Sequence, residues 1–198
     1  MEDKLIAEEI VNKAIQEVVF KYNAYAPIIS SFRIVYTDLI DTMGVDKYAR
    51  LIINPKFVVE NQNCIMGVIV HEVLHNFFGH TSDVRSKLAY TDDAEHNKIA
   101  NIAEDCAINQ FITETLPAGA ITPTSLQGML IGYNPFATNY VEYNQSAEYY
   151  YDLIMKKREE NKKKRKENSE GDGNGDDELK NEMCSTDQAN TKEMQDAL

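Results

Sequence analysis

Cysteine is scarce in this sequence and shows no pairing pattern. The 198 residues contain three cysteines, Cys64, Cys106 and Cys184, which lie far apart and include no C-x-x-C pair. An odd number of widely spaced cysteines argues against a disulfide framework and favours a reducing compartment. We therefore expect Cys64 and Cys106, which fall in apolar stretches, to be small core residues.

The sequence also lacks the features of an exported or membrane-spanning protein. Its longest apolar run covers residues 64–70, whereas a helix that crosses a bilayer needs about 20 apolar residues. The N-terminal sequence Met1-Glu2-Asp3-Lys4 is acidic and has no basic region of a signal peptide. We expect a soluble, cytoplasmic protein that does not contact a membrane.

Basic residues are in the minority, and the net charge of −12 is unevenly distributed. Residues 156–166 contain eight basic and two acidic side chains, whereas residues 167–198 contain ten acidic and two basic ones. Hydrophobic residues nearly disappear after residue 166. A segment of this composition cannot bury enough apolar area to offset the conformational entropy that it would lose on folding. We predict a folded domain over 1–166 and a disordered acidic tail or linker over 167–198. Because this tail would compete for the basic run, we expect no nucleic-acid contact.

Hydrophobic periodicity predicts a mostly helical α+β protein with a small sheet. Short β-branched runs at 32–36 and 50–53 predict two paired strands on either side of a turn at 41–44. Asn54-Pro55 predicts a capped short helix directly after the second strand. Apolar residues at helical spacing predict the longer helices. These cover about residues 4–22, 61–78, 96–115 and 146–154, the last continuing into the basic run.

The second of these helices contains the motif His71-Glu72-Val73-Leu74-His75, of the form H-E-x-x-H. Residues four apart lie on one face of a helix, so His71 and His75 can bind one tetrahedral zinc ion. Glu72 is placed to contact a water at that ion without being a ligand, as a general base does. Two buried histidines and a buried glutamate without a metal would be costly to desolvate. We therefore predict a metal site.

The next helix supplies our candidate for the third ligand. Asn101, Asp105 and Asn109 are spaced by four and form one polar row through an apolar surface. A carboxylate between two amides suits a zinc ligand that its neighbours hold by hydrogen bonds. We favour Asp105, and the adjacent Glu104 stays open as an alternative.

His80 is a further alternative for the third ligand. If the helix continued through residue 80, nine residues at 100° each would turn His80 away from His71, so only a break at Gly79 could bring it back. We expect His80 to cap the helix or to contact a ligand. Phe78 and Thr81 stand where the metzincin motif requires Gly and His, which excludes that family.

Three linked motifs resemble a known family. They are Leu-Ile-Ile-Asn-Pro-Lys-Phe-Val at 51–58, the H-E-x-x-H motif followed by Gly79-His80, and Asn-Ile-Ala-Glu-Asp-Cys-Ala-Ile-Asn at 101–109. This order is similar to that of the metallopeptidase domain at the N-terminus of bacterial and phage proteins that usually end in a von Willebrand A-like domain. Residues 147–150 resemble the family's closing helix, so the likeness covers about residues 30–155. No von Willebrand A-like domain follows here, which fits a stand-alone or a truncated form.

The resemblance implies a zincin-like fold, in which a small β-sheet packs beside the H-E-x-x-H helix. It also implies that the family's carboxylate ligand falls at Asp105, and that MoxR-type ATPases are possible partners. Zincins pair an extended substrate with an edge strand above the metal, and we expect residues 50–53 to be that edge. His96 is a weak candidate for stabilising an oxyanion, and we favour a place at the start of a helix for it.

We therefore predict a zinc-dependent peptidase that acts on a peptide or protein substrate. The ion held by His71, His75 and Asp105 lowers the pKa of a water to about 7, and Glu72 accepts its proton. Two alternatives remain open, a non-catalytic interaction module that zinc stabilises and an adaptor that acts with an ATPase partner.

Overall fold

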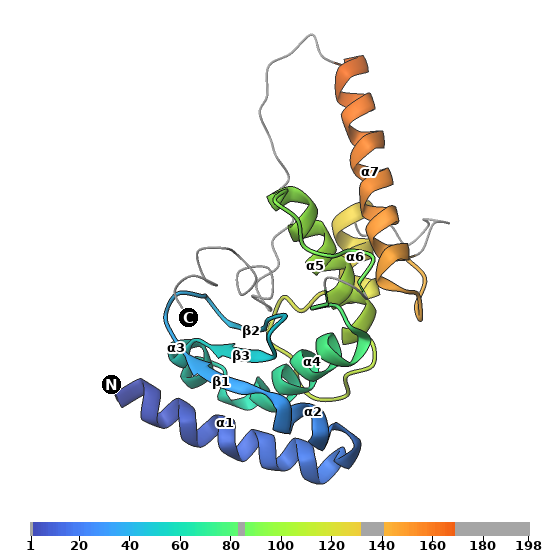
Figure 1. Cartoon of the computed structure of the whole chain (residues 1–198). Helices are drawn as coiled ribbons and strands as arrows, with labels where there is room; N and C mark the ends of the chain where they lie inside the picture. The colour runs from blue at the N-terminus through green and yellow to red at the C-terminus, as the bar shows by residue number, and fades with distance from the viewer. Residues whose placement is uncertain (1, 83–85, 132–140, 169–198) are drawn as a thin grey trace.

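The computed structural model describes residues 2–82, 86–131 and 141–168, and within them one small sheet lies at one end of a mostly helical fold (Figure 1). The elements in chain order are α1 (Glu2–Lys21), the 3-10 turn η1 (Asn23–Tyr25), α2 (Ala26–Ser31), β1 (Arg33–Tyr36), β2 (Met43–Val45), β3 (Arg50–Ile53), α3 (Pro55–Glu60), η2 (Gln62–Cys64), α4 (Ile65–Phe78), α5 (Ala94–Asn109), α6 (Pro123–Ile131) and α7 (Ala147–Asn168). The predicted α+β class is confirmed, because these elements are mostly helical and include one mixed sheet of three strands.

The sheet has the strand order β1-β3-β2. β1 pairs with β3 in parallel, and β2 pairs with β3 in antiparallel fashion. The two predicted strands are present, but the expectation that residues 50–53 form the sheet edge is wrong, because β3 lies between the other two strands. The true edge facing α4 is β2, which lies largely where the sequence predicts a turn at 41–44. A strand of three residues with a central glycine gives too short a pattern to recognise.

α1 and α3 form a layer with α4 that carries one part of the core. α1 buries Ala7, Val11, Ala14 and Val18 and packs against α3 and α4. Asn54 caps α3 as predicted, because its side chain accepts a hydrogen bond from the Lys56 backbone N–H at 2.9 Å. These contacts fix the end of β3 relative to α4.

α4 is a central helix whose residues 67–75 are all buried. It begins at Ile65 rather than Asn61, because residues 62–64 form the 3-10 turn η2. Gly79 ends it with a φ of 78°, a left-handed conformation in which glycine has no steric penalty. The predicted helix and its glycine stop are therefore confirmed.

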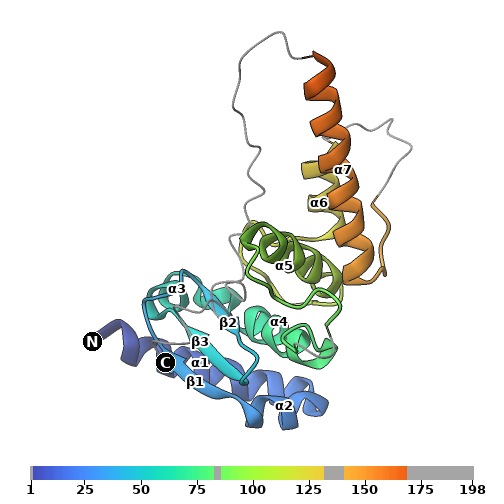
Figure 2. The same ribbon diagram turned by 45° about the horizontal axis from the view of Figure 1, so that its top comes forward.

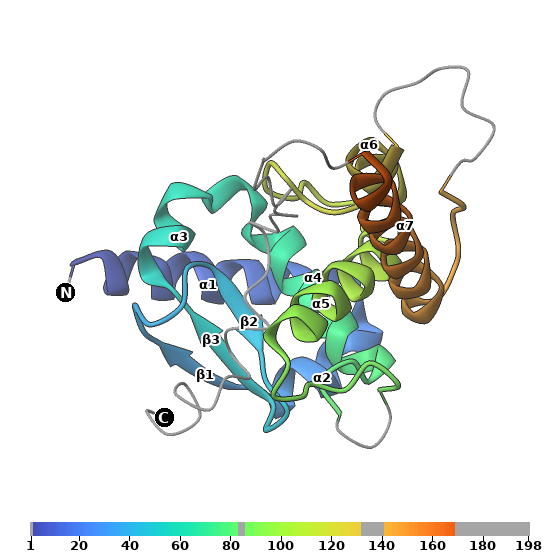
Figure 3. The same ribbon diagram turned by 90° about the horizontal axis from the view of Figure 1, so that it is seen from above.

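α5 begins two residues before the expected residue 96 and ends at Asn109, six residues before the expected end at about 115. Asp93 caps it by accepting hydrogen bonds from the backbone N–H groups of Glu95 and His96. α5 lies next to α4 in Figure 2, and α7 packs against α5 before projecting away from the rest of the fold. From above, the sheet with α1 and α3 lies on one side of the α4–α5 pair, and α6 and α7 lie on the other (Figure 3).

The basic run at 156–166 belongs to α7, as the helix prediction implied. Most of the expected disordered tail, residues 169–198, lies outside the described residues. In the part of the chain that the structure describes, no helix has the length and apolar character needed to cross a membrane.

Candidate metal centre

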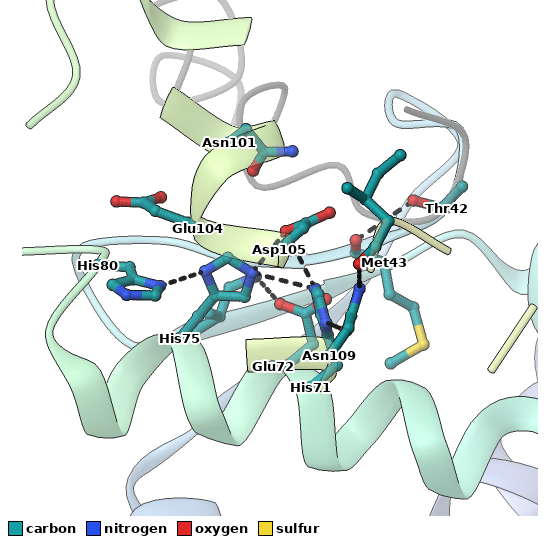
Figure 4. Close-up of polar contacts among 12 residues, drawn as sticks. Thr42, Met43, His71, Glu72, His75, His80, Asn101, Glu104, Asp105 and Asn109 are labelled. Carbon is teal, nitrogen blue, oxygen red and sulfur yellow. Dashed lines mark hydrogen bonds and ion pairs between the residues drawn. The ribbon is translucent and has the colours of Figure 1, made fainter. Parts of the chain in front are cut away.

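α4 and α5 bring three potential ligands together at their crossing (Figure 4). The Nε2 atoms of His71 and His75 are 3.0 Å apart, as expected from one helical turn. The Oδ1 atom of Asp105 lies 3.0 Å from His75 Nε2 and 3.5 Å from His71 Nε2. All three side chains have an exposed fraction of 0%. The structure thus gathers the three predicted ligands in one buried cluster.

The separations within this cluster fit a single cation. Ligand atoms at 2.0–2.1 Å from one tetrahedral zinc ion lie roughly 3.3 Å from one another. The three observed distances, 3.0, 3.0 and 3.5 Å, lie on either side of that value. Two imidazole nitrogens and a carboxylate oxygen are also the donor types that zinc prefers. The residues present therefore fit a metal ion.

Neighbouring side chains orient both imidazoles. Asn109 Oδ1 lies 2.7 Å from His71 Nδ1, and because an amide oxygen only accepts, the proton of His71 resides on Nδ1. In the neutral imidazole that a metal ion would need, the lone pair of His71 Nε2 would then face the cluster. Asn109 is itself held by donating from Nδ2 to the Ile121 carbonyl at 2.9 Å. Such outer hydrogen bonds are typical of histidines that bind a metal.

His80 performs a similar task for His75. Its Nδ1 lies 3.3 Å from His75 Nδ1. Burial, and then the charge on His75, lowers the pKa of His80 to about 3, so His80 is neutral and its Nδ1 can accept a hydrogen bond from the Nδ1–H of His75. Gly79 provides the break in the helix that places His80 here. The expectation that His80 contacts a ligand agrees with this geometry.

Asp105 is anionic in this setting. Burial by itself raises the pKa of its carboxyl, but the charges and hydrogen bonds of His71 and His75 outweigh that effect and hold the pKa well below its usual range. A carboxylate that stays ionised while fully buried is a suitable partner for a cation.

Glu72 lies beside the cluster without being part of it. Its Oε2 accepts a hydrogen bond from the Val45 backbone N–H, at 2.9 Å, which fixes the carboxyl against strand β2. Burial raises the pKa of Glu72, although the neighbouring histidines and the Val45 N–H act in the opposite direction. The carboxyl is therefore positioned by tertiary structure and is biased toward taking up a proton.

Comparison with known families agrees with this chemistry. Residues 7–197 match the family described as "Putative metallopeptidase domain". The chain belongs to this family. No curated protein and no solved structure matches it. A metallopeptidase domain implies a metal ion, and the buried groups described above are capable of holding one.

Glu104 of this metallopeptidase domain does not point at the cluster of His71, His75 and Asp105. Its side chain leaves α5 in a different direction from that of Asp105 and lies on the His80 side of His75 (Figure 4). With His75 and His80 it forms a second group whose potential ligand atoms lie within 4.8 Å of one another. Burial, followed by the charge of Asp105, raises the pKa of Glu104 well above its ordinary value. The open alternatives for the third ligand, Glu104 and His80, thus occupy the outer side of His75.

Two other polar residues singled out from the sequence lie away from the cluster. Asn101 accepts a hydrogen bond from the Tyr90 hydroxyl at 3.2 Å. His96 stands in the first turn of α5, where it contacts the Tyr151 hydroxyl and the Ala89 carbonyl. The preference for His96 as a helix-start residue is confirmed.

Sequence reasoning missed the contribution of β2. Val45 contacts Glu72 across 27 positions of the chain, and no local pattern marks it. The signal that existed was indirect. The resemblance implies an edge strand beside the H-E-x-x-H helix, but nothing in the residues at 43–45 marks them as that strand.

Proposed function

We propose that this protein is a zinc-dependent peptidase with a zincin-like arrangement of its site. The observation that carries the proposal is the convergence of His71 Nε2, His75 Nε2 and Asp105 Oδ1 within 3.5 Å, with Glu72 fixed beside them. Zinc held by these three residues would polarise the substrate carbonyl and acidify a water molecule.

Glu72 would perform the proton transfers. It would accept a proton from the attacking water and then deliver this proton to the amine that leaves. Its hydrogen bond with the Val45 N–H fixes the carboxyl group beside the three proposed ligands, which places it for this exchange. The raised pKa of Glu72 favours a carboxyl that can hold the proton between the two steps.

Strand β2 is the proposed docking edge for an extended substrate. In the antiparallel β2–β3 pair, the Thr42 carbonyl accepts from Asn54 N–H, and Asp46 N–H donates to the Arg50 carbonyl. Because bonding alternates along an antiparallel strand, the backbone groups of Val45 face away from β3. Val45 N–H indeed points to Glu72. A substrate strand added at this edge would run beside the proposed base.

The test measures metal content and peptide cleavage on the full chain. We expect about one zinc per chain by mass spectrometry, a large loss in Asp105→Ala, and retention in Glu104→Gln, which alters the neighbouring carboxylate. Glu72→Gln should keep its zinc and lower the cleavage rate of a mixture of peptides by roughly 10²–10⁴-fold.

Two results would contradict the proposal. Zinc kept by Asp105→Ala but lost by Glu104→Gln would assign the third ligand to Glu104. Equal cleavage, or none, by the parent chain and Glu72→Gln would make the metal a structural one, and the protein an interaction module rather than an enzyme.

A further inference from the structure

A cavity of about 340 Å³ adjoins the outer side of the metal centre. We call it the Glu104 pocket. It lies between the C-terminal end of α4, α5 and the start of α7, and its lining includes Phe78, His80, Leu88, Glu104, Ile108 and Phe111. Its volume is at the low end of the roughly 300–1,000 Å³ of ligand pockets, which suits one side chain better than a large ligand.

The floor of the pocket carries a buried carboxyl group with one oxygen that has no hydrogen-bond partner among the described residues. Glu104 has an exposed fraction of 0%. Its Oε1 accepts one long hydrogen bond, from the Ser86 hydroxyl at 3.3 Å. Its Oε2 has no hydrogen-bond partner among the described residues. A buried carboxylate oxygen without a donor is costly, and a donor brought by a ligand would remove that cost.

The wall of the pocket is a row of rings that leads to the metal centre. Phe111 stacks on Phe78 with centroids 6.4 Å apart, and Phe78 stacks on His80 at 5.9 Å. His80 in turn contacts His75 edge-on at 5.2 Å. Phe78 and Phe111 are half exposed, so the row begins at the surface. Ring faces attract cations as well as aliphatic chains.

The other charged side chains that line the pocket pair with each other and not with Glu104. Lys87 and Glu148 also line it, and they pair with each other at 3.6 Å. The Lys87 side chain is 79% exposed, so it is not the partner of the buried carboxyl. The His80 imidazole is engaged with His75. An apolar passage that ends at one buried carboxyl group without a donor suits a cation on a long aliphatic stem, because such a cation would favour the ionised form of that carboxyl.

We propose that the Glu104 pocket binds the lysine or arginine side chain of a substrate residue next to the cleaved bond, with Glu104 as the residue that selects it. The inference rests on the proposed peptidase function. The adjacency has a direct basis, because Glu104 precedes the proposed ligand Asp105 in the chain, and His80 contacts the proposed ligand His75.

The binding test separates recognition from cleavage. The zinc-loaded full chain with Glu72→Gln is titrated, by NMR, with acetyl-Ala-Lys-Ala-amide and with the same peptide carrying norleucine. The two probes differ by the ammonium group at the end of similar stems. We expect the lysine peptide to bind at least tenfold more tightly, and the preference to fall below threefold after a further Glu104→Gln exchange.

Two more variants serve as controls. Glu148→Gln removes the same charge from the rim and should leave the preference in place. Glu104→Asp keeps the charge on a shorter stem and should retain part of the preference, which separates loss of charge from a folding defect. Equal binding of both probes, or a preference that survives Glu104→Gln, would overturn the proposal. So would a second zinc per chain that Glu104→Gln removes, since Glu104 would then be a metal ligand.

Cleavage by the parent chain distinguishes this inference from the proposed function. If peptides are cut without preference for a neighbouring lysine or arginine, the peptidase stands and the pocket assignment is wrong. If no peptide is cut but the lysine probe binds through Glu104, the pocket stands as a binding site and the peptidase proposal is wrong.

Discussion

At the scale of single residues, the two asparagines that flank Asp105 on α5 have different roles. Asn109 accepts from His71 Nδ1 and is anchored by the Ile121 carbonyl. Asn101 instead accepts from the Tyr90 hydroxyl. Equal spacing from Asp105 in the sequence therefore does not produce equal contact with the candidate ligands. Only Asn109 sets the tautomer and direction of a proposed metal-binding imidazole.

This difference predicts unequal effects on zinc affinity. Asn109→Ala should weaken zinc binding by roughly 10–100-fold, because His71 loses the acceptor that holds its proton on Nδ1. Asn101→Ala, the matched change one turn on the other side of Asp105, should weaken it by less than about threefold. Competition with a chromogenic chelator measures both affinities. Equal losses would show that His71 is not oriented through Asn109.

At the scale of elements, α4 is held in place by a close approach at its first turn. A Cβ atom added at Gly67 would lie 2.3 Å from the Thr115 carbonyl oxygen and 3.2 Å from Glu114 Cβ. Backbone cannot yield to such a contact without moving the segment after α5. Since His71 is one turn further along α4, this contact also sets the position of the site relative to α5.

A pair of glycine substitutions tests this contact. Gly67→Ala should lower the free energy of unfolding by roughly 1–3 kcal/mol, because the added methyl forces α4 and residue 115 apart. Gly128→Ala in α6, where nothing lies within 4 Å of the new Cβ, should raise it by about 0.5–1 kcal/mol through helix propensity alone. Urea denaturation of both variants gives the two values. A neutral Gly67→Ala would mean that the close approach relaxes without cost.

At the scale of the whole molecule, the candidate metal centre joins two hydrophobic clusters. One cluster combines α1, the sheet, α3 and α4, and the other combines α5, α6 and α7. His71 and His75 lie on α4, which packs in the first cluster, whereas Asp105 lies on α5, most of whose buried hydrophobic residues pack in the second. A metal at this place would link the two halves of the core.

Metal removal should therefore destabilise the molecule. When free zinc exceeds its dissociation constant 100-fold, binding adds about 2.7 kcal/mol to the free energy of unfolding. We expect chelation to lower the thermal midpoint of the parent chain, and amide hydrogen exchange to accelerate more in α5 than in α1. Asp105→Ala should show neither response to the chelator. If the chelator does not change the thermal midpoint of the parent chain, the proposal that a metal ion links the two clusters is wrong.

The sequence by itself determined the longer helices α1, α4, α5 and α7, because a period of 3.6 residues is a local property, whereas the shorter α2 and α6 were not predicted. The H-E-x-x-H spacing, the glycine stop at residue 79 and the polar row through Asp105 could all be read in this way. Their roles in metal binding remain predictions, although the structure places His71, His75 and Asp105 together.

Only the tertiary structure decided which distant segments meet. The parallel pairing of β1 with β3, the edge position of β2 and the Val45 contact with Glu72 all depend on how the sheet packs on α4. The Glu104 pocket likewise requires the start of α7, more than 40 positions after Glu104. The reason is physical. Periodicity records which face of an element is buried, whereas the partner of that face is chosen by the packing of the whole chain.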